Sequence, residues 1–308
     1  MTEQTKSSHK LTGVIMLTTC ALIWGTAFIA QSIGGQYAEP LTINWARSLL
    51  ATIFLSLWVL GYDKYKGIKS PSLWGSEDPA YRSKLLKAGF GCGLALSAAT
   101  YMQQLGIMYT TVGKSGFITA LYIVLVPILG YVLLKQQVGL LQGLSVLVAA
   151  VGMYFICINE SFTINKGDFY TLICALCFAL QIIMVEKVIG GLDGVRLSLV
   201  QFATCTLVNG LLMFIFESPT LEQLTMSALP LLYLGIMSSG IAYTLQITGQ
   251  KYVTPVLACM LMSLESAFAL LSGWLLLGQT MSIREIGGCG LVFVAIMLAQ
   301  MPVGQEAK

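Results

Sequence analysis

The sequence predicts an all-α membrane protein in which ten transmembrane helices form two inverted five-helix repeats. Three observations lead to this fold class: few charged residues, ten separate apolar runs, and a similarity between the two halves of the chain. Of 308 residues, 56% are hydrophobic and 10% are charged, and the mean hydropathy is +0.79. Soluble proteins carry about 25% charged residues, so this composition excludes an ordinary soluble fold, and it equally excludes a disordered chain.

The ten apolar runs are each close to the ~20 residues that cross a bilayer as a helix. Breaks that contain glycine, proline or charged residues separate them. The first run lacks the short apolar core and cleavage site of a signal peptide, so we expect it to remain as a helix. The predicted spans are 12–33, 41–61, 86–108, 114–134, 140–158, 168–188, 197–216, 229–249, 254–277 and 285–301.

Lysine and arginine positions orient the predicted bundle. If the N-terminus is cytoplasmic, thirteen of the 17 basic residues fall in cytoplasmic segments, and Arg47 lies inside the second span. The three that fall outside are Lys114, Lys166 and Arg284. Because basic residues gather on the cytoplasmic side of membrane proteins, we expect residues 1–10 and 302–308 to be cytoplasmic tails.

The two halves of the chain resemble each other. A shift of 143 residues aligns Gln103 with Gln246, whereas the first spans of each half align at 154 to 156 residues, as Cys20 does with Cys174. Each half holds five spans, so the second half enters the membrane with the opposite topology. Inverted repeats of this kind are typical of secondary transporters, whose substrate site lies near the membrane midplane between the repeats.

Several motifs add a family resemblance. The segment 24–28 (W-G-T-A-F) resembles the W-G-x-x-F motif of EamA-type transporters in the drug/metabolite transporter superfamily. Pro40 followed by Arg47 is similar to that family's P-x6-R pattern in helix two. The segments 264–268 (L-E-S-A-F) and 276–279 (L-L-G-Q) resemble its L-E-P-x-x and L-L-G-E patterns in helix nine.

The resemblance covers about residues 10 to 300 and implies two EamA repeats, 11–158 and 168–301. It also implies a multi-pass transporter of small metabolites in the cytoplasmic membrane, with a cavity between the repeats. Amino-acid export is the activity it most commonly implies. Ser266 stands in place of the usual proline, and Gln136 and Gln279 in place of glutamate, so no role for those carboxylates carries over.

Glu265 and Arg47 are the charged residues inside predicted spans that are the strongest site candidates, and Glu186 is a further acid near the end of the span 168–188. A charge in the bilayer costs several kcal/mol, so it needs a partner, a cavity or a function. Glu265 is expected to line the cavity and to carry a proton or bind a substrate amine; the alternative is a structural carboxyl between helices. Arg47 lies nearer the membrane surface, where it either meets an anionic substrate group or binds backbone carbonyls.

Polar and aromatic side chains at helical spacing complete the predicted cavity, and uncharged groups of this kind suit a small neutral, zwitterionic or aromatic solute. The alternative is that they join helices to one another. Pro127 interrupts the hydrogen bonding of helix four and is a candidate hinge. The cavity candidates besides Glu265 are Trp24, Phe28, Gln31, Tyr101, Gln104, Met108, Ser115, Thr119, Tyr122, Phe178, Gln181, Tyr243, Gln246, Gln250 and Ser272.

The remaining composition narrows the function. His9 is the single histidine and the net charge is +3, which argues against a histidine metal site, a catalytic histidine or a nucleic-acid surface. We expect no cofactor and no enzymatic activity; the partners are the bilayer, a small solute and, in a coupled mechanism, protons. The favoured function is export of an amino acid or related metabolite by alternating access. An uptake carrier for a vitamin or nucleoside-like solute is the alternative, and a channel or a membrane enzyme is less favoured.

Overall fold

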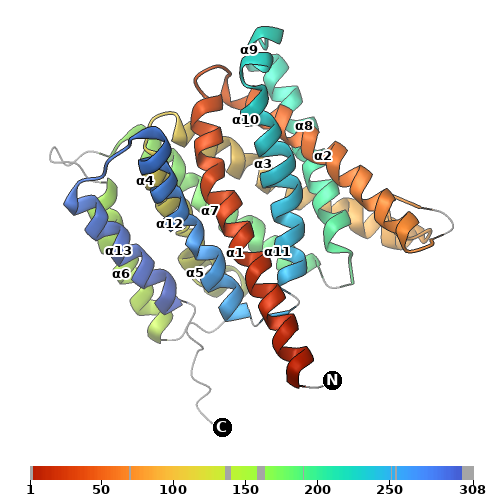
Figure 1. Cartoon of the computed structure of the whole chain (residues 1–308), viewed down its shortest axis with the longest axis horizontal. Coiled ribbons are helices and arrows are strands. Elements are labelled where there is room, and N and C mark those ends of the chain that lie inside the picture. The colour runs from red at the N-terminus through yellow and green to blue at the C-terminus, as the bar shows by residue number, and fades with distance from the viewer. Residues whose placement is uncertain are drawn as a thin grey trace.

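The computed structural model describes residues 3–68, 71–135, 140–157, 164–189, 191–250, 252–253 and 255–299. These residues form helices and contain no β-strand, which confirms the all-α prediction (Figure 1). In chain order the helices are α1 (Glu3–Gly34), α2 (Pro40–Tyr65), α3 (Pro79–Ile107), α4 (Val112–Thr119), α5 (Tyr122–Leu134), α6 (Leu140–Cys157), α7 (Lys166–Val188), α8 (Gly194–Phe216), α9 (Leu221–Met226), α10 (Ala228–Leu232), the π-helix η1 (Tyr233–Ala242), α11 (Tyr243–Gly249), α12 (Pro255–Leu277) and α13 (Ile283–Ala299).

Seven helical stretches in the described residues are long and apolar enough to cross a membrane. Two shorter apolar helices, Gly143–Ile156 and Leu264–Leu277, accompany them. Large apolar side chains such as Leu57, Phe214 and Trp274 are more than half exposed, as expected where lipid replaces water. The protein is therefore a multi-pass α-helical membrane protein.

Two predicted spans are not continuous α-helices. The span predicted at 114–134 is divided into α4 and α5 by a turn at Ala120 and Leu121. The span predicted at 229–249 contains the ten-residue π-helix η1 between α10 and α11. π-helical turns are rare and occur often at functional sites, so η1 is a candidate part of the functional site.

Helix starts are set by local capping residues. Asp78 accepts hydrogen bonds from the amides of Ala80 and Tyr81 at the start of α3, and Asp193 accepts one from Arg196 N at the start of α8. Asn165 caps α7 through Gly167 N. These side chains satisfy amide groups that have no partner within their own helix, and they fix where each helix begins.

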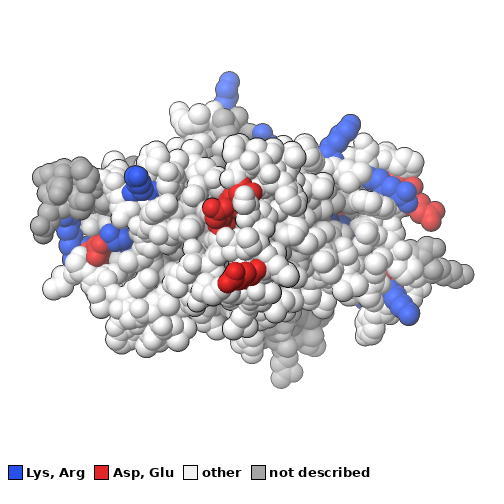
Figure 2. Space-filling view, turned by 90° about the horizontal axis from the view of Figure 1, so that it is seen from above, with Lys and Arg blue, Asp and Glu red and all other residues white. Residues whose placement is uncertain are grey.

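The connections lie on two opposite faces of the bundle. Face A carries the segments 35–39, 108–111, 217–220 and 278–282, and face B carries the segments 71–78 and 191–193. The N-terminal end of α1 lies at the bottom of Figure 1 and α9 lies at its top. Seen from above, charged side chains are few and scattered over a mostly uncharged surface (Figure 2).

Helices from the two halves of the chain pack directly against each other. The most extensive pairs are α6 with α13, α3 with α7, α1 with α12, and α2 with α8. Gly25 permits close approach of α1 to α12, since a Cβ at this position would lie 2.7 Å from the carbonyl oxygen of Glu265. The largest core cluster combines side chains of α4, α5, α6, α7 and α13.

Candidate functional site

An aromatic group lies where α1, α8 and α11 meet. The ring of Tyr243 has Trp24 and Phe202 as edge-on neighbours, with ring centroids 5.2 Å away in both cases. Trp24 Nε1 donates a hydrogen bond of 3.0 Å to the carbonyl oxygen of Ser238 in η1. The structure thus brings together two predicted site residues, Trp24 and Tyr243, and ties them to the π-helix.

Glu265 is buried on α12, with 8% of its surface exposed. Within the described part of the chain its carboxyl group has no hydrogen-bond or ion-pair partner. Its backbone packs against α1 beside Trp24, since a Cβ added at Gly25 would lie 2.7 Å from the carbonyl oxygen of Glu265. A buried carboxyl group without a compensating cation is costly in lipid, so it is available to a proton or to a cationic ligand group.

Arg47 is buried on α2, with 6% of its surface exposed. Its Nη2 donates to Ser239 Oγ of η1 at 3.3 Å, whereas its Nη1 has no hydrogen-bond partner among the described residues. Arg47 and Trp24 therefore contact neighbouring residues of η1, Ser239 and Ser238. An unused donor on a buried guanidinium suits an anionic ligand group such as a carboxylate.

Several predicted cavity amides are engaged in contacts between helices. Gln104 Nε2 donates to the carbonyl oxygen of Gln31 at 3.0 Å, and both side chains are buried. Gln181 Nε2 donates to Gln201 Oε1 at 2.8 Å. These bonds join α3 to α1 and α7 to α8, as expected of polar side chains that stabilise a helix bundle.

The other predicted site residues are distributed over the bundle. Tyr122 and Phe178 lie with ring centroids 6.3 Å apart between α5 and α7. Phe28 is buried in an apolar cluster with Ala269, and Ser272 Oγ donates to the carbonyl oxygen of Ala269. The remaining candidates range from buried to exposed: Tyr101 and Gln246 are half-buried, Ser115 and Thr119 are buried, and Met108 and Gln250 are exposed.

The predicted hinge at Pro127 lies inside α5, and its side chain is outside the described part of the chain. The observed interruption lies earlier, at Ala120 and Leu121. The backbone there closes a tighter turn, since Ile123 N donates to Ala120 O and Val124 N to Leu121 O. Gln136, one of the two glutamines noted at glutamate positions, also falls outside the described residues.

Gln279, the other such glutamine, has a structural partner. Its Oε1 accepts a hydrogen bond of 2.9 Å from Val112 N at the start of α4. Nearby on face A, Lys114 Nζ lies 2.5 Å from Glu285 Oε1 and 3.9 Å from Asp168 Oδ2. This network joins α4 of the first half to α7, α13 and the α12–α13 connection of the second half.

Several buried polar contacts between helices were not predicted. Asn44 Nδ2 donates to the carbonyl oxygen of Thr100, and Ser97 Oγ donates to Asn209 Oδ1. The first joins α2 to α3, and the second joins α3 to α8. An asparagine inside an apolar run is the sequence signal that could have identified both contacts.

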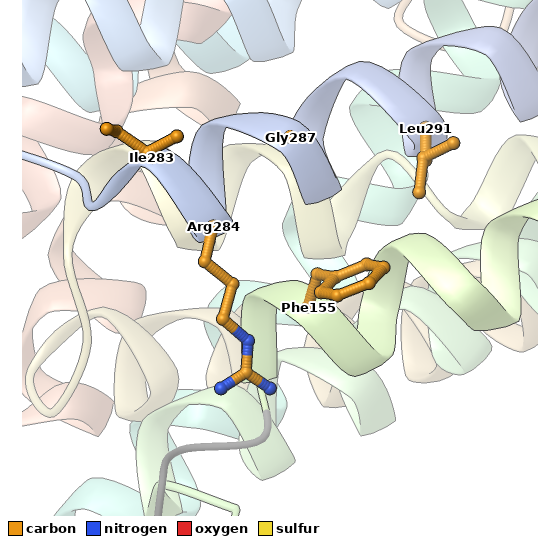
Figure 3. Close-up of a pocket in the computed structure, with 5 residues that line it drawn as sticks. All are labelled: Phe155, Ile283, Arg284, Gly287 and Leu291. Carbon is orange, nitrogen blue, oxygen red and sulfur yellow. The ribbon is translucent and has the colours of Figure 1, made fainter.

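A pocket of about 400 Å³ lies between α6 and α13, and its lining residues include Phe155, Arg284 and Leu291 (Figure 3). The Arg284 guanidinium lies 5.4 Å from the ring centroid of Tyr154 and 5.8 Å from that of Phe155. The lining of the pocket includes neither Glu265 nor Tyr243. We therefore place the candidate site at the Arg47, Tyr243 and Glu265 group rather than at this pocket.

Comparison with known proteins agrees with a transporter fold. An uncharacterized transporter of Archaeoglobus fulgidus is 27% identical over 287 residues, which are 93% of this chain and 85% of that protein. The uncharacterized transporter YoaV of Bacillus subtilis is 23% identical and covers 93% of this chain and 94% of its own. A chloroplastic WAT1-related protein of Arabidopsis thaliana is 22% identical over 92% of this chain and 68% of its own.

One solved structure, titled as the crystal structure of a protein, has the same fold. It superposes with a TM-score of 0.63 at 15% identity and covers 93% of this chain and 96% of its own. The sequence profile of the EamA-like transporter family matches residues 11–158 and 165–301. The two matches together include most of the chain, so the protein belongs to the EamA-like transporter family and is not an enzyme.

Proposed function

We propose that this protein is a secondary active transporter that exports an amino acid or related small metabolite across the cytoplasmic membrane by alternating access. The observation that carries the proposal is Glu265, a buried carboxyl group with no partner among the described residues. In a membrane such a group binds a proton, a cationic substrate group, or each in turn. Exchange between the two ligands is a simple way to couple export to the proton gradient.

The substrate would span the group around Tyr243. A substrate ammonium neutralises Glu265, and a substrate carboxylate accepts from the unused Nη1 of Arg47. Arg47 contacts the same part of η1 as Trp24, and Glu265 lies on α12 against Gly25, the neighbour of Trp24. The rings of Trp24 and Tyr243 offer an apolar and aromatic wall. These features favour a zwitterion over a nucleoside-like solute, the alternative that the thermal-shift screen described below tests.

Alternating access requires two halves that exchange conformations, and the packing is consistent with an inverted repeat over residues 11–158 and 168–301. Pairs of equivalent predicted spans, one from each half, pack together: α2 with α8, and α6 with α13. Contacts between spans that are not equivalents also match. The third predicted span (α3) packs on the sixth (α7), and their equivalents, the eighth (η1 and α11) and the first (α1), pack on each other as well. On the orientation that the basic residues predict, face B and both termini are cytoplasmic.

The experiment is flux in proteoliposomes. Purified protein is reconstituted with a mixture of radiolabelled L-amino acids on one side, and flux is followed with and without a pH gradient. We expect concentrative flux that follows the gradient and saturates with substrate. Glu265→Gln should lower this flux by at least about tenfold, while Glu222→Gln, at an exposed position of α9, should leave it unchanged.

Two outcomes contradict the proposal. Wild-type rate and wild-type pH dependence in Glu265→Gln would remove the role of this carboxyl group. Flux that never saturates and never exceeds the equilibrium distribution would indicate a channel. Thermal-shift screening against amino acids, amines, vitamins and nucleosides identifies the ligand class independently of flux.

A further inference from the structure

Three polar contacts join α2 to α8 or to the residue that follows it, at both ends and in the middle. On face A, the Glu217 carboxylate accepts hydrogen bonds of 2.8 and 2.7 Å from Leu41 N and Thr42 N, and one of 2.8 Å from Thr42 Oγ1. In the middle, Thr52 Oγ1 and Thr206 Oγ1 lie 3.2 Å apart.

On face B, Arg196 Nη2 lies 2.6 Å from both carboxylate oxygens of Asp63. Arg196 also donates to the carbonyl oxygen of Ser72 in the α2–α3 connection. The side chains of Asp63 and Arg196 are 4% and 11% exposed, so this ion pair is shielded from water and is only weakly screened. We call the face A contact of Glu217 and the face B contact of Asp63 the two end contacts.

The two end contacts are equivalent under one shift along the sequence. Adding 154 to the residue number takes Thr42 to Arg196 and Asp63 to Glu217. In each contact, an acid at the end of one helix therefore binds the first turn of the other helix, at the equivalent position. The same shift takes Thr52 to Thr206, so the middle contact joins a residue to its own equivalent. A local two-fold axis relating α2 to α8 must pass close to this threonine pair.

This symmetry has a consequence for exchange between two conformations. If the halves exchange conformations, the contact on face A takes on the geometry that its equivalent had on face B, and the reverse. Both end contacts are formed in the present conformation, so both are also formed in the exchanged one. The two halves differ in conformation here. The predicted fourth span is broken at Ala120, whereas its equivalent α12 is continuous, and the predicted eighth span contains η1, whereas its equivalent α3 is α-helical throughout.

We infer that α2 and α8 form a rigid pair that stays joined on both faces throughout the transport cycle, with Asp63 and Glu217 as its positioning residues. This inference rests on the proposed function, because it assumes alternating access. The gates then lie between other helices, and α2 carries Arg47 into the site from a fixed position.

The experiment cross-links each end of the pair in the full-length protein. Thr42→Cys with Glu217→Cys and Asp63→Cys with Arg196→Cys are treated with a short bifunctional thiosulfonate, and intact mass verifies one cross-link per molecule. The matched controls are the four single-cysteine variants and the wild type given the same reagent. We expect cross-linked protein in proteoliposomes to keep amino-acid flux within about twofold of its own reduced form. Loss of flux on cross-linking either end, restored by reduction, overturns the inference.

A spectroscopic measurement covers the case in which the cysteine variants fail to fold. Spin labels at Glu39 and Phe216 report face A, labels at Tyr65 and Leu192 report face B, and neither pair replaces an end-contact residue. We expect one distance population for each pair, with and without the amino-acid mixture and the pH gradient, and two populations in either pair overturn the inference. Absence of flux in the wild type counts against the proposed function alone, since these distances are measured without a transport assay.

Discussion

The indole of Trp24 meets the ring of Tyr243 edge-on, with centroids 5.2 Å apart and ring planes inclined by 68°. The same indole donates its N–H to the carbonyl oxygen of Ser238, in the π-helix that leads into Tyr243. One side chain of α1 therefore contacts the second half of the chain both by ring packing and by a hydrogen bond. This double contact makes Trp24 one link between α1 and the irregular segment of the predicted eighth span, and the contact of Thr26 Oγ1 with the Tyr233 hydroxyl at 2.6 Å is another.

Trp24→Phe should destabilise the protein because it keeps an aromatic ring but removes the N–H donor. The expected loss is about 1 kcal/mol, visible as a lower midpoint of thermal unfolding in detergent. Trp58→Phe is the matched control, because Trp58 is 48% exposed and lies on the surface of α2. Equal midpoint shifts in the two variants would contradict a special role for the Trp24 hydrogen bond.

Gly25→Ala should also destabilise the protein, through a steric effect. A Cβ at Gly25 would lie 2.5 Å from Phe268 Cβ and 2.7 Å from the carbonyl oxygen of Glu265. Overpacking of this kind costs about 1–3 kcal/mol and would push α1 away from α12. Gly61→Ala is the control: a Cβ there meets nothing within 4 Å, and it should be neutral or gain about 0.5–1 kcal/mol. A thermal midpoint that falls by the same amount in both variants would rule out the steric explanation.

Lys114→Met should give a stability loss that depends on pH. Lys114 lies between two acids, Glu285 at 2.5 Å and Asp168 at 3.9 Å, and its removal leaves two negative charges close together. Protonation of the acids relieves that repulsion, so the deficit relative to wild type should be greatest at neutral pH and should shrink as the pH falls. Thermal unfolding midpoints of both proteins, measured from neutral to acidic pH, test the prediction.

The double variant Lys114→Met with Glu285→Gln tests the same network. It removes one of the two negative charges together with the lysine, so it should recover part of the stability at neutral pH. A deficit in Lys114→Met that does not change with pH, and no recovery in the double variant, would mean that repulsion between the acids is not the cause.

Arg47→Lys should weaken binding of a substrate that carries a carboxylate. Lysine keeps the charge but loses the planar fork, including the Nη1 donor that has no partner among the described residues. We expect the dissociation constant of the transported amino acid to rise by about tenfold, with little change for its carboxamide analogue. Arg82→Lys on face B is the control. Equal losses for the acid and the amide would show that Arg47 does not contact the carboxylate.

Apolar run length was sufficient to predict an all-α membrane protein, and the predicted bounds of α2 and α8 fall within those of the structure. Hydropathy depends on the side chains and not on which backbone groups pair with each other, so it could not predict η1 or the turn at Ala120. Pro127 is a stronger local signal for an interruption than anything near Ala120, yet α5 continues through Pro127. The span therefore breaks at Ala120 and Leu121 and not at the proline.

The candidate site was predicted in part. Inside apolar runs charge is rare, so Glu265 and Arg47 could be identified from position alone. Which side-chain amides bind other helices could not be predicted, because Gln104 and Gln181 have the same helical spacing whether they face a cavity or a neighbouring helix. The end contacts of α2 and α8 were missed for a different reason. Their members lie near predicted loops, and the shift of 154 becomes informative for them only when both helix ends are seen to meet.

The π-helix also determines which way the following segment faces. Each π-helical turn holds one residue more than an α-helical turn, and each residue of an α-helix turns the chain by about 100°. If η1 tightened to α-helical geometry, every residue of α11 would rotate about the helix axis. Tyr243 would then swing away from Trp24, and the site would lose its aromatic wall without any helix tilting. A change of helical register within this one segment would thus be enough to separate Tyr243 from Trp24 and change the shape of the site.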